Sequence, residues 1–78
     1  MNIPEEVLFD ISMKVYDEYN DKIATMYDYV GEIYTYQDIE EMKQAEEEYE
    51  RELIQQYLDG KLKYTEEDIQ RIREYLNN

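Results

Sequence analysis

Apolar residues recur every three or four positions through most of this chain, as they do along one face of an α-helix. In the first third of the chain these positions are Leu8, Ile11, Val15, Tyr19, Ile23, Met26 and Val30. Asn2 is the expected N-capping side chain, Pro4 suits a first turn, and Gly31 suits a left-handed C-cap. The pattern predicts one long helix over about residues 4–30.

A different structure for the end of this segment is a short tyrosine-rich β-hairpin, with residues 26–30 and 32–36 paired around Gly31. The helical period continues without a break through Ile23, Met26 and Val30, and this favours the helix.

Two further helices begin with the same local motif. Thr35-x-x-Asp38 and Thr65-x-x-Asp68 both resemble capping boxes, with Asp in place of the usual Glu. The apolar positions that follow the first motif are Ile39, Met42, Tyr49, Leu53 and Tyr57, and those that follow the second are Ile69, Ile72, Tyr75 and Leu76. We therefore expect helices over about residues 36–58, ending at Asp59-Gly60, and 66–76.

Three helices with short links predict an all-α fold, a single small domain over residues 1–78. The expected architecture is a long antiparallel α-hairpin with a shorter C-terminal helix. The middle of the second helix is weakly apolar, because Glu46 and Glu50 fall on its apolar stripe, and we expect these turns to pack loosely. The alternative is that the long helices pair between two chains, as a homodimer.

The composition excludes most kinds of chemistry. The chain has no cysteine and no histidine, which removes disulfides, thiolate nucleophiles, the commonest general base and the usual zinc ligands. It has no glycine-rich phosphate loop, and its many carboxylates single out no catalytic pair. We expect no enzyme activity, no metal site and no cofactor.

The charge is strongly negative, with 21 acidic residues against eight basic ones and a net charge of −13. Such a chain repels phosphates, so we expect no direct binding to nucleic acid or to anionic lipid, and instead a basic protein partner. No apolar run is long enough to span a membrane, and the N-terminus lacks the marks of a signal peptide. We expect a cytoplasmic protein.

The acidic residues fall in rows on the two long helices. Like charges stand four residues apart at Asp17/Asp21, Glu46/Glu50 and Glu48/Glu52, which costs helix stability and suggests that the charge density is itself useful. The candidate partner-binding acids are Asp10, Asp17, Asp21, Asp28, Glu40, Glu41, Glu46, Glu47, Glu48, Glu50 and Glu52. Beside them we expect three exposed tyrosines to act as aromatic anchors: Tyr29, Tyr36 and Tyr49.

In size, acidity and lack of catalytic groups, the chain resembles the DNA-mimic inhibitors of phages and other mobile elements, which include anti-restriction and anti-CRISPR proteins. This resemblance implies an inhibitor, phage-encoded and acting in the host cytoplasm, that occupies the basic nucleic-acid-binding surface of another protein. Two other hypotheses remain: an antitoxin or immunity protein that neutralises a basic toxin, and a self-associating structural protein whose acidity keeps it in solution.

Overall fold

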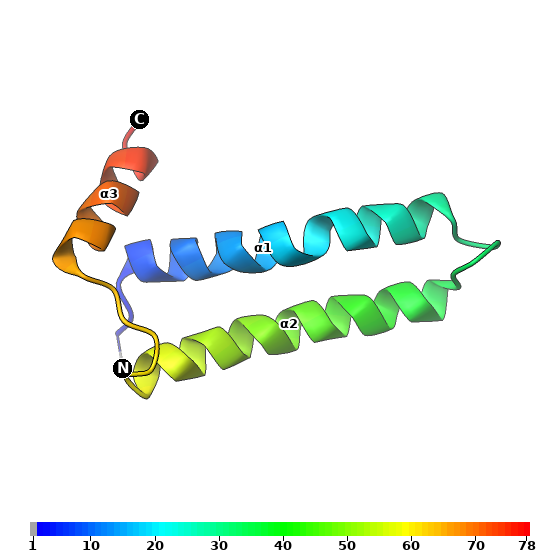
Figure 1. The fold of residues 1–78 in the computed structure, drawn as a ribbon, viewed down its shortest axis with the longest axis horizontal. Helices are drawn as coiled ribbons and strands as arrows, with labels where there is room; N and C mark the ends of the chain where they lie inside the picture. The colour runs from blue at the N-terminus through cyan, green and yellow to red at the C-terminus, as the bar shows by residue number, and fades with distance from the viewer. Residues whose placement is uncertain (1) are drawn as a thin grey trace.

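The computed structural model describes residues 2–78 and shows a long helical hairpin with a third helix across one end (Figure 1). Helix α1 spans Glu5–Asp28, α2 spans Tyr36–Leu58 and α3 spans Glu66–Leu76. α1 and α2 lie antiparallel, and α3 packs on α1 near its N-terminus at a steep angle to the hairpin. The molecule measures 47 × 30 × 16 Å. The predicted all-α, three-helix architecture is confirmed.

Helix α1 begins one residue later than expected and is capped differently. Its N-cap is Pro4, which has no side-chain capping bond, and the Pro4 carbonyl accepts the N–H groups of Val7 and Leu8 at 3.0 and 3.1 Å. The prediction that Asn2 caps this helix was wrong, because Asn2 lies two residues upstream of the N-cap, whereas a capping side chain sits at the N-cap itself.

The turn between the long helices is short and densely hydrogen-bonded. α1 ends at Asp28, so the predicted helix was two residues too long. The Tyr29 carbonyl accepts the N–H groups of residues 32, 33 and 34 at 3.1, 3.0 and 3.2 Å. Gly31 has a φ of 88°, as expected for glycine, and its N–H bonds the Tyr34 carbonyl at 2.8 Å. The β-hairpin alternative was wrong, since residues 26–28 are helical and only an isolated bridge joins Val30 to Tyr34.

Both predicted capping boxes are present. The Thr35 hydroxyl accepts the Asp38 N–H at 3.1 Å, and the Asp38 carboxylate accepts the Thr35 N–H at 2.8 Å. Thr65 and Asp68 make the same pair of bonds at 3.1 and 2.9 Å. Each box satisfies N–H groups that a helix start leaves without a partner, and this fixes where α2 and α3 begin.

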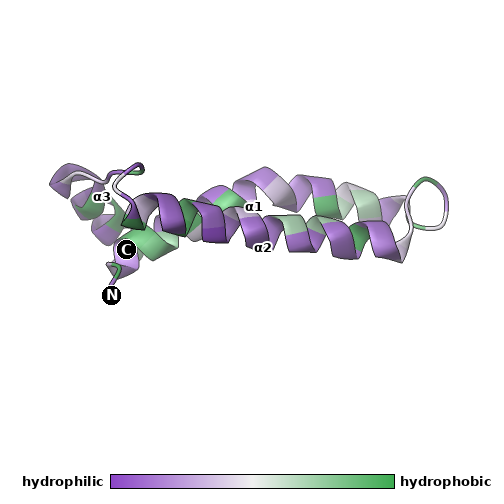
Figure 2. Cartoon of the chain, turned by 90° about the horizontal axis from the view of Figure 1, so that it is seen from below, coloured by the Kyte–Doolittle hydropathy of each residue, from purple (hydrophilic) through white to green (hydrophobic). Residues whose placement is uncertain are grey.

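The main core lies at the end of the hairpin that carries α3. Its buried members come from both long helices: Val7, Ile11, Val15 and Leu53. Leu8, predicted on the buried face, is 38% exposed, because the core follows the four-residue spacing that begins at Val7. Near the turn, only Met26 and Ile39 are buried. Seen from the side of α2, hydrophilic and hydrophobic residues alternate along both long helices (Figure 2).

The two ends also differ in charge. We call residues 2–15 and 53–78 the three-helix end, and residues 16–52 the loop end. The loop end carries 13 acidic and three basic side chains, whereas the three-helix end carries eight and five. Most of the net negative charge therefore lies on the free arm of the hairpin, away from α3.

Candidate partner-binding surface

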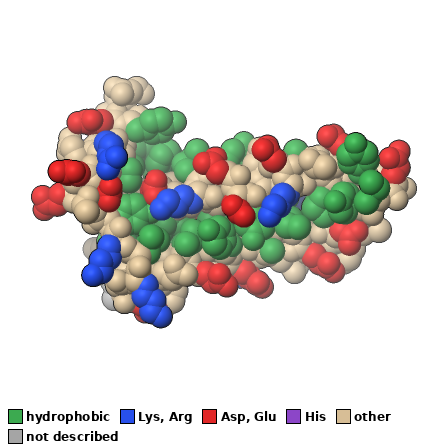
Figure 3. Space-filling view, viewed as in Figure 1, with side chains coloured by type: hydrophobic (Ala, Val, Ile, Leu, Met, Phe, Trp, Pro, Cys, Tyr) green, Lys and Arg blue, Asp and Glu red, His purple; other side chains and the backbone are tan. Residues whose placement is uncertain are grey.

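The aspartates of α1 form an exposed row along the outer edge of the arm. Asp17, Asp21 and Asp28 are all exposed. At 100° per residue, Asp28 projects about 160° away from the buried Met26, so this part of the row points away from α2. Figure 3 shows acidic side chains along the long edges of the hairpin.

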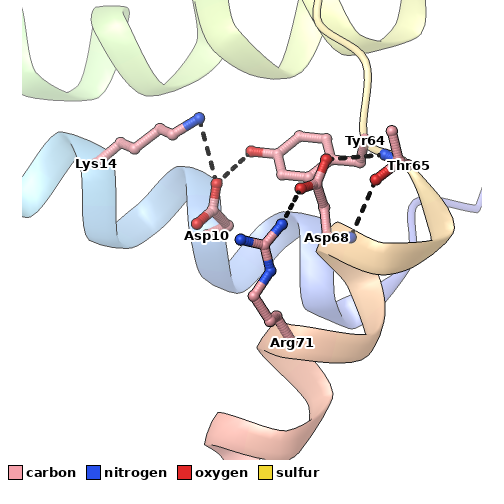
Figure 4. Close-up of polar contacts among 6 residues, drawn as sticks. All are labelled: Asp10, Lys14, Tyr64, Thr65, Asp68 and Arg71. Carbon is pink, nitrogen blue, oxygen red and sulfur yellow. Dashed lines mark hydrogen bonds and ion pairs between the residues drawn. The ribbon is translucent and has the colours of Figure 1, made fainter.

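Asp10, the first member of the predicted row, has partners within the chain. Its carboxylate accepts a hydrogen bond from the Tyr64 hydroxyl at 2.5 Å and pairs with Lys14 at 3.3 Å (Figure 4). Burial, together with the bond to Asp10, raises the pKa of Tyr64 well above its usual range. At 100° per residue, Asp10 projects only about 100° from the buried Ile11, close enough to the packed side of α1 to meet Tyr64. Asp10 therefore helps to join the segment before α3 to α1.

The acids of α2 divide into an outer set and an inner set. Glu41 and Glu48 are exposed and point away from α1, since Glu41 projects about 160° from the buried Ile39. Three others are exposed on the flanks of the helix: Glu40, Glu47 and Glu52.

Glu46 and Glu50 belong to the inner set. Both are half-buried, and Glu50 accepts a hydrogen bond from the Ser12 hydroxyl at 3.3 Å across the hairpin. Between Ile39 and Leu53 no residue of α2 is fully buried. The expected weak packing of these turns is therefore confirmed, but Glu46 and Glu50 face the seam between the helices more than a partner.

The three candidate tyrosines have different surroundings. Tyr36 is 70% exposed and Tyr29 is 44% exposed. Tyr49 is half-buried, packs against the main core, and lies 5.9 Å from Tyr19 between ring centroids. The expectation that Tyr49 is exposed was wrong, because its ring fills the place of the aliphatic residues that the middle of α2 lacks.

Two of the three basic side chains in the loop end lie over aromatic rings. The Lys22 ammonium is 5.5 Å from the Tyr19 ring centre and 3.8 Å from the Glu18 carboxylate. The Lys43 ammonium is 5.4 Å from the Tyr27 ring centre, and its hydrogen bond with Tyr27 raises the pKa of Lys43. The three basic side chains of the loop end offset only part of its 13 acidic charges, which leaves a net charge of −10 there.

The exposed acids therefore form two edges rather than one surface. The α1 row points away from α2, and the outer acids of α2 point away from α1. A partner that lies flat on one edge contacts one row, whereas a partner that encloses the arm contacts both. The structure brings Asp17, Asp21 and Asp28 together on one edge and Glu41 and Glu48 on the other.

Sequence reasoning missed one prominent side chain. Ile33 is 69% exposed in the turn between the long helices. A large aliphatic residue next to a turn glycine, between Glu32 and the capping Thr35, was a signal that could have identified it.

The described residues hold no group of three or more His, Cys, Asp or Glu side chains placed to bind a metal ion. Within residues 2–78, no helix has the length and apolarity needed to cross a bilayer. The arrangement defines a small helical hairpin with an acidic arm. Comparison of the chain with protein-family models, curated proteins and solved structures found no match.

Proposed function

We propose that this protein is an acidic inhibitor that binds another protein on a basic, nucleic-acid-binding surface. Its carboxylates take the place of phosphates there and exclude DNA or RNA. The site of action is the cytoplasm, that of the host cell if the protein is phage-encoded.

The observation that carries the proposal is the separation of charge along the molecule. The loop end has 13 acids and three bases on an arm that α3 leaves free. Opposite charges on two proteins speed their encounter and select the correct partner more than they add affinity. An arm with this charge suits a groove lined by Lys and Arg.

The spacing of the acids supports phosphate mimicry. At 1.5 Å per residue, Asp17 and Asp21 are about 6 Å apart along the α1 axis, and Asp21 and Asp28 about 10 Å. Phosphates on one DNA strand follow each other every 3.4 Å or so along the duplex axis, so the row matches every second or third phosphate.

The test compares two variants that each lose three negative charges. The loop-end variant carries Asp17→Asn, Asp21→Asn and Asp28→Asn, and the control variant carries Glu5→Gln, Glu67→Gln and Glu74→Gln in the three-helix end. Each is immobilised and exposed to the heparin-retained protein fraction of cells of the source organism, which is enriched in nucleic-acid-binding proteins. We expect the loop-end variant to capture less than the control variant at low salt.

The captured protein is then purified and mixed with labelled duplex DNA or RNA. The proposal predicts that the wild-type protein displaces the nucleic acid, and that its association rate falls steeply with salt. A salt-independent association rate, or simultaneous binding of both ligands, would show that the proposed function is wrong.

Self-association is a second candidate, because several large apolar side chains of α1 stay uncovered. Leu8, Met13, Tyr16 and Tyr27 are between 37% and 53% exposed. Sedimentation at micromolar concentration separates the two candidates: a tight dimer that captures no basic protein favours self-association.

A further inference from the structure

The two most exposed large apolar side chains among residues 2–78, Ile33 and Tyr36, both lie in or next to the turn at the loop end. Tyr36 is 70% exposed and Ile33 is 69% exposed, and Tyr29, at the end of α1, is 44% exposed. We call these three residues the apolar tip. They come from the turn and from the two helix ends that it joins, at the point of the molecule furthest from α3 (Figure 1).

The turn that presents the tip is held in one conformation. Three successive N–H groups bond the Tyr29 carbonyl, and the Gly31 N–H bonds the Tyr34 carbonyl. The Thr35–Asp38 capping box fixes the start of α2 directly beside Tyr36. A side chain on such a turn loses little backbone freedom on binding, so its exposure is suited to recognition.

The charge around the tip decides what can cover it. Residues 23–42 include five acidic side chains and no basic one. A second copy of the chain would bring these acids against each other, and an anionic lipid surface would repel them. A protein surface with an apolar pocket and a basic rim suits both the side chains and the charge.

We propose that the apolar tip is the anchor of the partner interface. Ile33 and Tyr36 enter an apolar pocket of the partner, and Lys or Arg side chains around that pocket meet the acids of the turn and of both helix ends. Anchors of this kind, buried at the centre of an interface and ringed by polar contacts, supply most of the binding energy in many complexes. This inference rests on the proposed function and adds the place on the arm where the partner binds.

The test uses the whole 78-residue chain and the same heparin-retained fraction. The tip variant carries Ile33→Ser and Tyr36→Ser. Its matched control is Tyr16→Ser, which removes an aromatic that is 53% exposed on α1, outside the tip. We expect the tip variant to capture at least tenfold less partner than the control at every salt concentration, with the same dependence on salt as the wild type. Circular dichroism and the thermal midpoint verify that both variants fold.

A cross-linking experiment tests the same contact while it keeps a large apolar side chain at position 33. A photoreactive benzoylphenylalanine replaces Ile33 in one sample and Gln56, exposed at the three-helix end, in another. We expect cross-links from position 33 alone, to a partner peptide that has apolar residues next to Lys or Arg.

The outcomes separate the two proposals. If the tip variant captures as much partner as the Tyr16→Ser control while the Asp17, Asp21 and Asp28 variant loses capture, the tip inference is wrong and the proposed function stands. If the tip variant loses capture and binding does not depend on salt, the tip is an anchor for a partner recognised without phosphate mimicry. If every variant captures the same proteins as the wild type, in the same amounts, both proposals fail.

Discussion

The two ends of the hairpin are built from the same two long helices but differ in packing and charge. The three-helix end buries Val7, Ile11, Val15 and Leu53, and side chains of α3 and of the segment before it bond to α1. The loop end buries only Met26 and Ile39, exposes Ile33 and Tyr36, and carries most of the negative charge. A domain of this size can bury only a limited core, so concentrating the stabilising contacts at one end leaves the other end free to expose apolar and acidic side chains.

The joint between α3 and α1 shows how the first end is stabilised. The Arg73 guanidinium pairs with Glu6 at 3.1 Å, and the Phe9 and Tyr75 rings lie 5.8 Å apart. The backbone hydrogen bond at Glu6, and then Arg73, hold the pKa of Glu6 below its usual range. No residue of α3 is fully buried, so these contacts and the Tyr64–Asp10 bond, rather than a deep core, fix its position.

Truncating a buried side chain at each end should give the largest effects. Ile11→Ala is expected to lower the free energy of unfolding by about 4 kcal/mol, and Met26→Ala by about 2 kcal/mol. Ile11 belongs to the four-residue buried cluster, whereas Met26 lies outside it near the turn. The total for a 78-residue domain is only about 4–12 kcal/mol, so Ile11→Ala removes about a third of it or more.

Urea denaturation followed by circular dichroism measures both changes, with Ile11→Val, expected to cost about 1 kcal/mol, as the conservative control. Equal losses at Ile11 and Met26 would mean that the core is distributed evenly, and the comparison of the two ends would then fail.

Removing the hydroxyl that joins the α3 segment to α1 should give the next largest effect. Tyr64→Phe keeps the ring, which packs edge-on to Tyr57 at 6.0 Å, and leaves Asp10 without its neutral donor. We expect a loss of about 1.5–3 kcal/mol in the free energy of unfolding, as is usual for a hydrogen bond to a charged group. Fluorescence-monitored urea titrations of the two proteins give the value.

We also expect the effect of Tyr64→Phe on stability to depend on pH. The pKa of Tyr64 is higher in the folded protein than the ordinary tyrosine value of 10.0. The stability that Tyr64 contributes to the fold is therefore complete below about pH 10 and is lost as the pH rises toward the pKa of the folded protein. The difference in stability between wild type and Tyr64→Phe should be constant from pH 6 to about pH 9 and shrink at higher pH. A difference in stability that already changes between about pH 6 and pH 9 would contradict the assignment of this pH dependence to Tyr64.

The capping boxes give a smaller and matched pair of changes. Thr35→Ala and Thr65→Ala should each cost about 1 kcal/mol, because each removes the hydroxyl that accepts an Asp N–H. Hydrogen exchange distinguishes them: Thr35→Ala should speed exchange in the turn and the first turns of α2, and Thr65→Ala in α3. Faster exchange at the far end in either variant would show that the two ends unfold together.

Local patterns predicted the helices more closely than the site. The capping motifs at Thr35 and Thr65 placed the starts of α2 and α3 at the observed residues, because these bonds are made within four residues of sequence. The end of α1 was predicted less well, since the stripe continues to Val30 while the Tyr29 carbonyl already turns the chain.

Whether each candidate site residue is exposed depends on how the helices pair. No local sequence pattern shows that Asp10 contacts Tyr64, 54 residues later, or that the Tyr49 ring packs near the Tyr19 ring. The buried stripe moves around α1 between Val7 and Met26, so residues on one row of the helix, such as Asp10 and Asp28, come to lie in different surroundings. Three of the four aspartates stayed exposed, which the sequence could indicate only as a face of an isolated helix.

The smallest expected effects are two changes in the free energy of unfolding, of opposite sign at the two ends of the hairpin. Asp21→Asn removes one of two like charges four residues apart on the arm, and it should raise the free energy of unfolding by a few tenths of a kcal/mol. Glu67→Gln removes the same charge from the first turn of α3, where a negative side chain favours the helix dipole, and it should lower the stability instead. Both changes should fade as salt screens them, and thermal midpoints at low and high NaCl measure this. If both substitutions raise stability, the fold responds only to its total charge. If the signs differ as expected, the arm keeps its carboxylates at a cost in stability, and that cost is the reason to assign them a function.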